Sequence, residues 1–223
     1  MSYISDKITE IQSTLRQGVT LLAVSKFHPA EKIQQAYDAG HRSFGESRPQ
    51  ELKAKYDALP KDIKWHMIGH LQTNKIKYIA PFVHLIESLD SERLAAAIDR
   101  EAAKCGRTID CLLEIHVTDE ESKSGWEWSE LKAFVEAGGF QHYPNIRIRG
   151  VMGMATFTDD ESVIREDFRR LRVVLDNVRH EFPKIAEDFS EFSIGMSDDY
   201  RTAIEYGSTM IRIGSMIFGE RSY

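Results

Sequence analysis

The sequence predicts a (β/α)8 barrel of the TIM type, an α/β fold in which eight parallel strands alternate with helices. Short apolar runs recur along the 223 residues, helical patterns separate them, and polar or glycine-containing turns follow several of the runs. A doubly wound open sheet would show the same alternation and stays open as an alternative, although its glycine-rich dinucleotide fingerprint is absent. We see no linker or internal repeat, so we expect a single domain over residues 1–223.

The first elements follow from apolar spacing and from the residues that end helices. Four apolar residues at helical spacing predict the first helix: Ile4, Ile8, Ile11 and Leu15. Gly18 ends this helix, and a strand is expected over residues 21–26. Pro29 suits the first turn of the helix that follows, and Gly40 ends it.

Further apolar runs predict the other strands at residues 42–45, 64–68, 82–86, 109–116, 146–152, 191–195 and 209–213. Helical patterns separate these runs. One begins near Ser91 and ends before Gly106, and another ends at Gly138. The longest begins at a capping box over residues 158–161 and ends at Pro183.

The composition argues against several classes of protein. A net charge of −6 is unlike that of a general nucleic-acid binder. Cys105 and Cys111 are too few for a disulfide framework and look like reduced thiols, which favours the cytoplasm. The N-terminus has no apolar signal region, and no apolar run approaches the roughly 18 residues of a membrane span. We therefore expect a cytoplasmic protein that binds neither nucleic acid nor a membrane.

Lys26 ends the first predicted strand, and a lysine at the end of a buried strand is costly unless its amine is used. Residues 21–24 are apolar on both faces, as a central buried strand requires. Burial lowers the pKa of an ammonium group, and a free amine condenses readily with an aldehyde. The structural alternative is a lysine whose side chain runs along apolar surface to reach water.

The second signal is a place for an anion beside the last predicted strand. Gly214 and Ser215 follow that strand, and Ser197 follows the strand before it. Barrels often bind phosphate with these two loops and a short extra helix, for which residues 215–218 are the candidate. The structural alternatives are that Ser197 only caps a helix over residues 198–206 and that Gly214 only makes a turn. A buried amine beside a phosphate site points to a phosphorylated aldehyde, and pyridoxal 5'-phosphate (PLP) is the obvious one.

Arg212 lies in the last predicted strand, which neighbours the first if the barrel closes, so it would come close to Lys26. An arginine that faces the pyridine nitrogen of PLP keeps its own proton and leaves that nitrogen unprotonated. The ring then withdraws electrons poorly, whereas an enzyme that needs a strong electron sink usually places a carboxylate there. The structural alternative is an ion pair of Arg212, for example with Glu114.

Six segments of the chain resemble the pyridoxal phosphate homeostasis protein family, which is related to the N-terminal barrel of alanine racemase. In the order of the family, they are residues 23–26, 44–46, 65–75, 122–125, 195–199 and 207–214. They span nearly the whole chain, and the stretch from Trp65 to Lys75 is very specific.

The resemblance implies PLP held as a Schiff base on Lys26, with Arg212 near the ring nitrogen. It also implies phosphate contacts from Ser197, Gly214 and Ser215. Where the family often has asparagine after Phe-Gly-Glu, this chain has Ser47, and we include it as a candidate contact to the cofactor.

The resemblance implies the buffering or delivery of this vitamin B6 cofactor rather than turnover, with apo forms of PLP-dependent enzymes as candidate recipients. We expect a monomer. A PLP-dependent racemase is one alternative, but racemisation needs a base on each face of the substrate, and Lys26 supplies one. The chain stops at Tyr223, without the C-terminal β domain of alanine racemase, so we expect little or no turnover. The other alternative is a non-covalent binder of another phosphorylated metabolite.

His66 and His70 have the spacing of zinc ligands on a helix. However, His66 is expected in a strand and His70 lies beyond Gly69, so the two would not share a helical face. We therefore expect no metal site.

Three further sets of residues carry weaker signals. By resemblance, Lys123 lies near the mouth of the barrel and takes part in cofactor release, and the alternative is a solvated surface charge. Trp126 and Trp128 are expected to pack rather than to bind a ligand. Asp198 and Asp199 are expected to favour the N-terminus of their helix.

Overall fold

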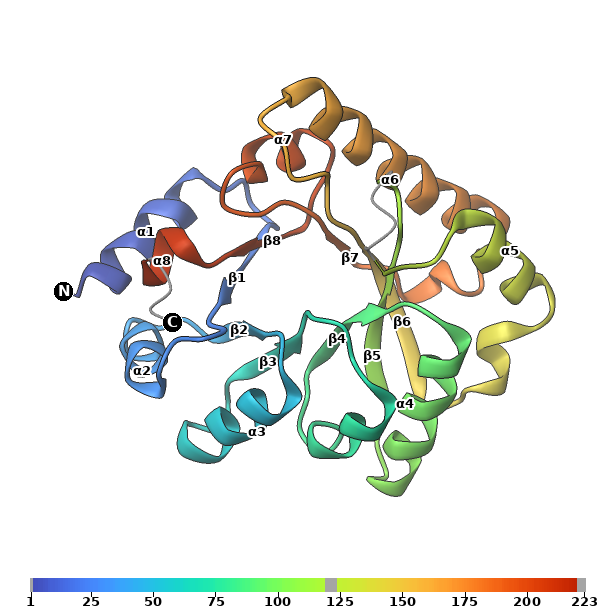
Figure 1. Ribbon diagram of the computed structural model, residues 1–223, viewed down its shortest axis with the longest axis horizontal. Helices are drawn as coiled ribbons and strands as arrows, with labels where there is room; N and C mark the ends of the chain where they lie inside the picture. The colour runs from blue at the N-terminus through green and yellow to red at the C-terminus, as the bar shows by residue number, and fades with distance from the viewer. Residues whose placement is uncertain (1, 119–123, 220–223) are drawn as a thin grey trace.

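The computed structural model describes residues 2–118 and 124–219, and in these residues eight parallel strands close into a barrel in sequence order (Figure 1). The strands are β1 (Thr20–Val24), β2 (Ser43–Glu46), β3 (Lys64–Met67), β4 (Leu85–Leu89), β5 (Ile109–Glu114), β6 (Ile146–Met152), β7 (Glu191–Ser193) and β8 (Met210–Ile213). β1 pairs with β8, and Leu22 lies opposite Arg212. The predicted barrel is therefore confirmed, and the open sheet is wrong.

Helices surround the strands on the outside of the barrel (Figure 1). The α-helices are α1 (Tyr3–Thr14), α2 (Ala30–Asp38), α3 (Pro49–Ala58), α4 (Glu92–Lys104), α5 (Trp128–Glu136), α6 (Glu161–Glu181), α7 (Tyr200–Glu205) and α8 (Ser215–Phe218). The 3₁₀ helices are η1 (Thr73–Tyr78), η2 (Gly139–His142) and η3 (Ala186–Asp188). Between β3 and β4, η1 takes the place of an α-helix. The long helix α6 ends before Pro183, as predicted. The predicted capping box over residues 158–161 is wrong, because the N-cap residue is Asp160, whose carboxylate accepts a hydrogen bond from the Ser162 N–H.

Five strands contribute buried apolar side chains to a cluster separate from the larger core: Leu22, Leu85, Leu112, Met152 and Met210. Side chains alternate along a strand, so a residue two positions further also faces the interior, nearer the C-terminal end of the strand. Counted from Leu85, Leu112 and Met210, these positions hold Glu87, Glu114 and Arg212. The barrel therefore has an apolar floor and polar groups at its mouth, while a larger apolar core lies between the strands and the helices.

The fourth strand is shifted from its predicted place, because it begins three residues later, at position 85 instead of 82. The N–H groups of Phe82 and Val83 donate to the carbonyl of Ile79 and so complete the turn after η1. The strand then includes Glu87 and Ser88, both fully buried. Because these two buried residues are polar, the apolar run in the sequence does not coincide with the strand.

Other elements end or begin one or two residues from their predicted bounds. β1 ends at Val24, two residues before Lys26, and β7 ends at Ser193. The predicted helix over residues 198–206 is shorter, because α7 begins at Tyr200. Each shift lengthens the loop at the C-terminal end of a strand, where the candidate residues lie.

Cys105 and Cys111 are both free thiols, as expected from the sequence. Cys105 is exposed and Cys111 is buried. Among the described residues, no helix has both the length and the apolar character that a membrane crossing needs.

Candidate functional site

Lys26 lies in the turn directly after β1, at the C-terminal end of the barrel, and is half-buried. Barrels of this kind carry their chemistry at this end. The next residue, Phe27, has a φ of +67°, in the left-handed region that residues other than glycine rarely adopt. Strained backbone conformations of this kind cluster at functional sites, which agrees with a functional role for the loop that carries Lys26.

The loops after β7 and β8 meet at two serine side chains. The Ser215 hydroxyl donates a hydrogen bond to the Ser197 hydroxyl, with 3.2 Å between the oxygens. Ser215 is the first residue of α8, as predicted. Asp199 is the N-cap residue of α7, although its side chain turns back to accept a hydrogen bond from the Met196 N–H. The interpretation of Ser197 as a helix cap is therefore wrong, and the two hydroxyls form a pair at the mouth.

Gly214 brings this serine pair close to β1. A Cβ atom at Gly214 would lie 3.1 Å from the carbonyl oxygen of Val24 and 3.4 Å from its Cβ. Close approach rather than an unusual φ explains the glycine, because its φ of −118° is open to any residue. The serine pair is thus placed beside the end of β1, two residues before Lys26.

Arg212 is buried in the barrel and makes three hydrogen bonds to neighbouring strands and loops. Its Nη1 donates to the carbonyl and the hydroxyl of Ser193, each at 2.7 Å, and its Nη2 donates to the carbonyl of Gly153 at 2.8 Å. The Ser193 hydroxyl donates in turn to Oε2 of Glu87 at 2.6 Å. Nδ1 of His66 lies 2.8 Å from Oε1 of Glu87, and because a carboxylate only accepts, this nitrogen carries the proton.

The opposite charges of Glu87 and Arg212 stabilise each other. Burial alone would raise the pKa of Glu87, but the hydrogen bond and charge of His66, together with Arg212 and Ser193, lower it overall. Burial lowers the pKa of Arg212, which the negative charge of Glu87 opposes. A guanidinium does not lose its proton in proteins, so a fixed cation faces a carboxylate across one hydroxyl group.

Glu114 is the second buried carboxyl group at the mouth. Its Oε1 accepts a hydrogen bond from the Ser124 hydroxyl at 3.1 Å, and its Oε2 has no hydrogen-bond partner among the described residues. Burial raises the pKa of Glu114 to about 7. The sequence left open an ion pair between Glu114 and Arg212, but the hydrogen bonds of Arg212 go to Ser193 and Gly153.

Ser47 lies on the β2 side of the mouth, half-buried, and packs against the loop after β3. A Cβ atom at Gly69 would lie 2.7 Å from both the Cβ and the carbonyl oxygen of Ser47. With His70, Gln72 and Lys75, among others, Ser47 also lines a surface pocket of about 210 Å³. These contacts place Ser47 beside the loop after β3.

The two histidines and two tryptophans that the sequence singled out have structural partners. His66 is buried in β3, whereas His70 lies beyond it, with Nδ1 3.2 Å from Oδ2 of Asp90. Trp126 stacks on the ring of Phe134, and Trp128 packs against the core, so the prediction that both tryptophans pack is confirmed. Lys123 lies outside the described residues.

The pKa of Glu114 gives a testable consequence for stability. It rises from 4.5 to about 7 on folding, so the folded protein binds the extra proton, and this group costs stability as the pH rises from about 4.5 to about 7. Glu114→Gln removes that titration. We expect the free energy of unfolding of the variant to vary less with pH in this window and to exceed that of the wild type by roughly 1–3 kcal/mol above pH 7. Chemical denaturation across the window measures both, and equal pH slopes for the two proteins would contradict the assignment.

Comparisons with known proteins agree with this architecture. The family model described as alanine racemase, N-terminal domain, matches residues 1–222. The pyridoxal phosphate homeostasis protein of Aquifex aeolicus is 41% identical over 204 residues, which cover 91% of this chain and 87% of the relative. The protein of the same name from Escherichia coli K12 is 34% identical, over 100% of this chain and 96% of the relative.

Solved structures give the same picture. PipY of Synechococcus elongatus PCC7942, in its structure with PLP bound, matches with a TM-score of 0.88 and 34% identity over 97% of this chain and 100% of its own. An alanine racemase of Clostridium difficile 630 matches with a TM-score of 0.77 but 12% identity, over 99% of this chain and 57% of its own, which is a likeness of fold. This chain therefore belongs to the alanine racemase N-terminal domain family and, within it, to the pyridoxal phosphate homeostasis proteins.

Proposed function

We propose that this protein binds PLP through a Schiff base on Lys26 and takes part in PLP homeostasis, buffering or delivering the cofactor without efficient turnover. The observation that carries the proposal is the hydroxyl pair of Ser197 and Ser215, which lies beside the end of β1, two residues before Lys26. The name shared by the relatives and the PLP in the PipY structure support it.

The residues at the mouth fit the two ends of PLP. The hydroxyls of Ser197 and Ser215 and the backbone at Gly214 would hold the phosphate, because an anion accepts strong hydrogen bonds from such groups. The amine of Lys26 would add to the aldehyde carbon, and the aldehyde oxygen would leave as water, so that a C=N bond replaces C=O. Lys26 would thus make the covalent attachment, and the serine pair would fix the orientation of PLP.

Arg212 favours binding over catalysis. In the proposed site it faces the ring nitrogen, and the contacts to Ser193 and Gly153 keep its guanidinium in place. Bound PLP supplies an electron-withdrawing ring, and a ring nitrogen without a proton makes that ring a weak electron sink. Ser47 follows β2, which neighbours β1 on the side away from β8, and would approach the ring from there.

Delivery requires a recipient, and we propose apo forms of PLP-dependent enzymes in the cytoplasm for this role, with this protein acting as a monomer. The loops that carry Ser197, Ser215 and Lys26 all lie at one end of the barrel, so release of the cofactor would occur at that end.

Lys26→Ala should abolish covalent attachment, because it removes the amine and leaves the floor of the barrel intact. The wild type, incubated with PLP and reduced with borohydride, should lose its yellow colour and gain the mass of one reduced adduct. Lys53→Ala is the matched control, since Lys53 pairs with Asp57 on α3 and its side chain is 42% exposed. A Lys26→Ala protein that still carries the adduct would contradict the attachment site, and a wild type that binds PLP without any adduct would favour a non-covalent binder.

The double variant Ser197→Ala, Ser215→Ala tests the phosphate contacts. Hydrogen bonds to a charged group contribute roughly 1.5–3 kcal/mol each, so we expect the affinity for PLP to fall about tenfold or more. The affinity for pyridoxal, which has no phosphate, should change little. Titration with both ligands measures the difference, and an equal loss for the two would place the phosphate elsewhere.

The holo-protein should not racemise amino acids at ordinary enzymatic rates. Lys26 supplies one base, and Arg212 leaves the ring a weak electron sink. Incubation with each common L-amino acid, followed by chiral analysis, tests this expectation, with an alanine racemase as the positive control. Formation of D-amino acids at rates near those of the control would favour the racemase alternative.

A further inference from the structure

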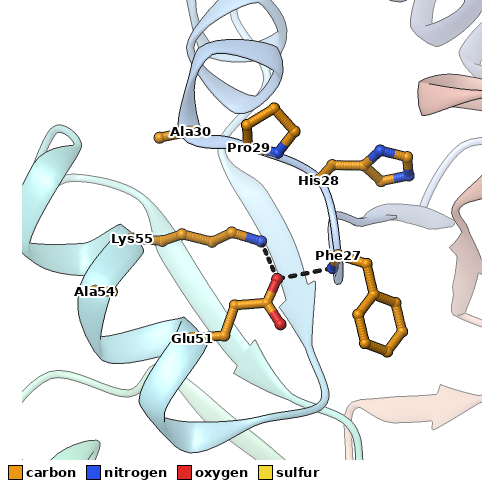
Figure 2. Close-up of a pocket in the computed structure, with 7 residues that line it drawn as sticks. All are labelled: Phe27, His28, Pro29, Ala30, Glu51, Ala54 and Lys55. Atoms are coloured by element: carbon orange, nitrogen blue, oxygen red, sulfur yellow. Dashed lines mark hydrogen bonds and ion pairs between the residues drawn. The ribbon is translucent and has the colours of Figure 1, made fainter. Parts of the chain in front are cut away.

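Helix α3 holds the loop that carries Lys26 on both sides of that residue. Oε1 of Glu51 accepts a hydrogen bond from the N–H of Phe27 at 2.7 Å, the amide directly after Lys26 (Figure 2). Nζ of Lys55 donates to the carbonyl of Ser25 at 2.8 Å, the carbonyl directly before it. Glu51 and Lys55 lie one helical turn apart and form an ion pair of 2.7 Å, so a single turn of α3 fixes both flanking peptides.

A second carboxylate, from β2, completes this group. Oε1 of Glu46 accepts hydrogen bonds from Nζ of Lys55 at 2.7 Å and from the hydroxyl of Ser25 at 2.5 Å. Glu46 is fully buried, and Lys55 is 6% exposed. The three N–H groups of the Lys55 ammonium thus have three oxygen acceptors, on Ser25, Glu46 and Glu51. We call Glu46, Glu51 and Lys55 the α3 clamp.

The loop needs such support for two reasons. The left-handed conformation of Phe27 is unfavourable for a side chain with a Cβ atom, and it persists only where surrounding contacts impose it. A pocket of about 580 Å³ also opens beside the loop, lined by residues 27–30 together with Glu51, Ala54 and Lys55 (Figure 2). On that side, polar side chains of α3 reach the backbone of the loop.

We propose that Glu51 and Lys55 are positioning residues for Lys26, which hold its loop so that the amine meets the aldehyde of a PLP molecule whose phosphate is bound at Ser197 and Ser215. This inference rests on the proposed function. The clamp would govern how fast the C=N bond forms, because displacement of a reacting group by about 1 Å can slow a reaction by about 100-fold. It would leave the phosphate contacts unchanged, since those lie on the loops after β7 and β8.

The test compares variants of α3 by two readouts. Glu51→Ala removes the acceptor of the Phe27 N–H, Glu51→Gln keeps an oxygen at that place, and Asp57→Asn is the matched control from the exposed Lys53–Asp57 pair of the same helix. The first readout is the rate of imine formation after PLP is added to PLP-free protein, followed by absorbance. The second is hydrogen exchange of the Phe27 amide, which needs no cofactor.

We expect Glu51→Ala to slow imine formation about tenfold or more and to speed exchange of the Phe27 amide by a similar factor. Glu51→Gln should fall between Glu51→Ala and the wild type, and Asp57→Asn should match the wild type in both readouts. Inorganic phosphate, used as a competitor, should inhibit PLP binding equally in all four proteins, since the phosphate contacts are intact.

Lys55→Met alone would leave the buried Glu46 carboxylate without its cation and therefore destabilise the fold. The double variant Glu46→Gln, Lys55→Met removes both charges and should also slow imine formation about tenfold or more, with Lys53→Met as its control. A wild type that forms no imine would overturn the proposed function. If the wild type forms the imine no faster than Glu51→Ala and the double variant do, the positioning role alone is overturned. Unchanged hydrogen exchange of the Phe27 amide in Glu51→Ala would overturn it as well.

Discussion

The pairing of β1 with β8 is the constraint on which the site depends. Lys26 and Ser215 lie near opposite ends of the chain, and only closure of the barrel brings them to neighbouring loops. Parallel strands place all their C-terminal ends at one end of the barrel, so the loops after β1, β7 and β8 must meet there. Gly214 lets that approach become close, because it adds no side chain between β8 and Val24. The proposed site, for a molecule with an aldehyde at one end and a phosphate at the other, depends on this closure.

The floor of the barrel is apolar and its mouth is charged, so the charges at the mouth need partners. The side chains of Leu85, Leu112 and Met210 make the floor apolar, and a buried cation at the mouth is tolerated only if it is well paired. Arg212 satisfies that condition through Ser193 and Gly153, with the carboxylate of Glu87 behind Ser193. These hydrogen bonds fix the position of the guanidinium, which suits its proposed role of facing the ring nitrogen of PLP.

The sequence predicted the barrel and the meeting of its first and last strands, because most strands are apolar runs bounded by turns. The sequence did not predict a role for Glu87, because β4 is fully buried yet carries a charge. The partners of Glu87 come together only in the folded barrel. The role of Glu51 and Lys55 was not predicted for another reason. Their i,i+4 spacing predicts a surface pair on a helix, and nothing in the sequence indicates that both also reach the backbone around Lys26.

A crystal structure of the protein grown with PLP tests the central claim most directly. The account predicts continuous density from Nζ of Lys26 to the carbon of the former aldehyde, with the phosphate within hydrogen-bond distance of the Ser197 and Ser215 hydroxyls and the ring nitrogen facing Arg212. Density for PLP that is separate from Lys26, or a phosphate bound away from the loops after β7 and β8, would contradict it.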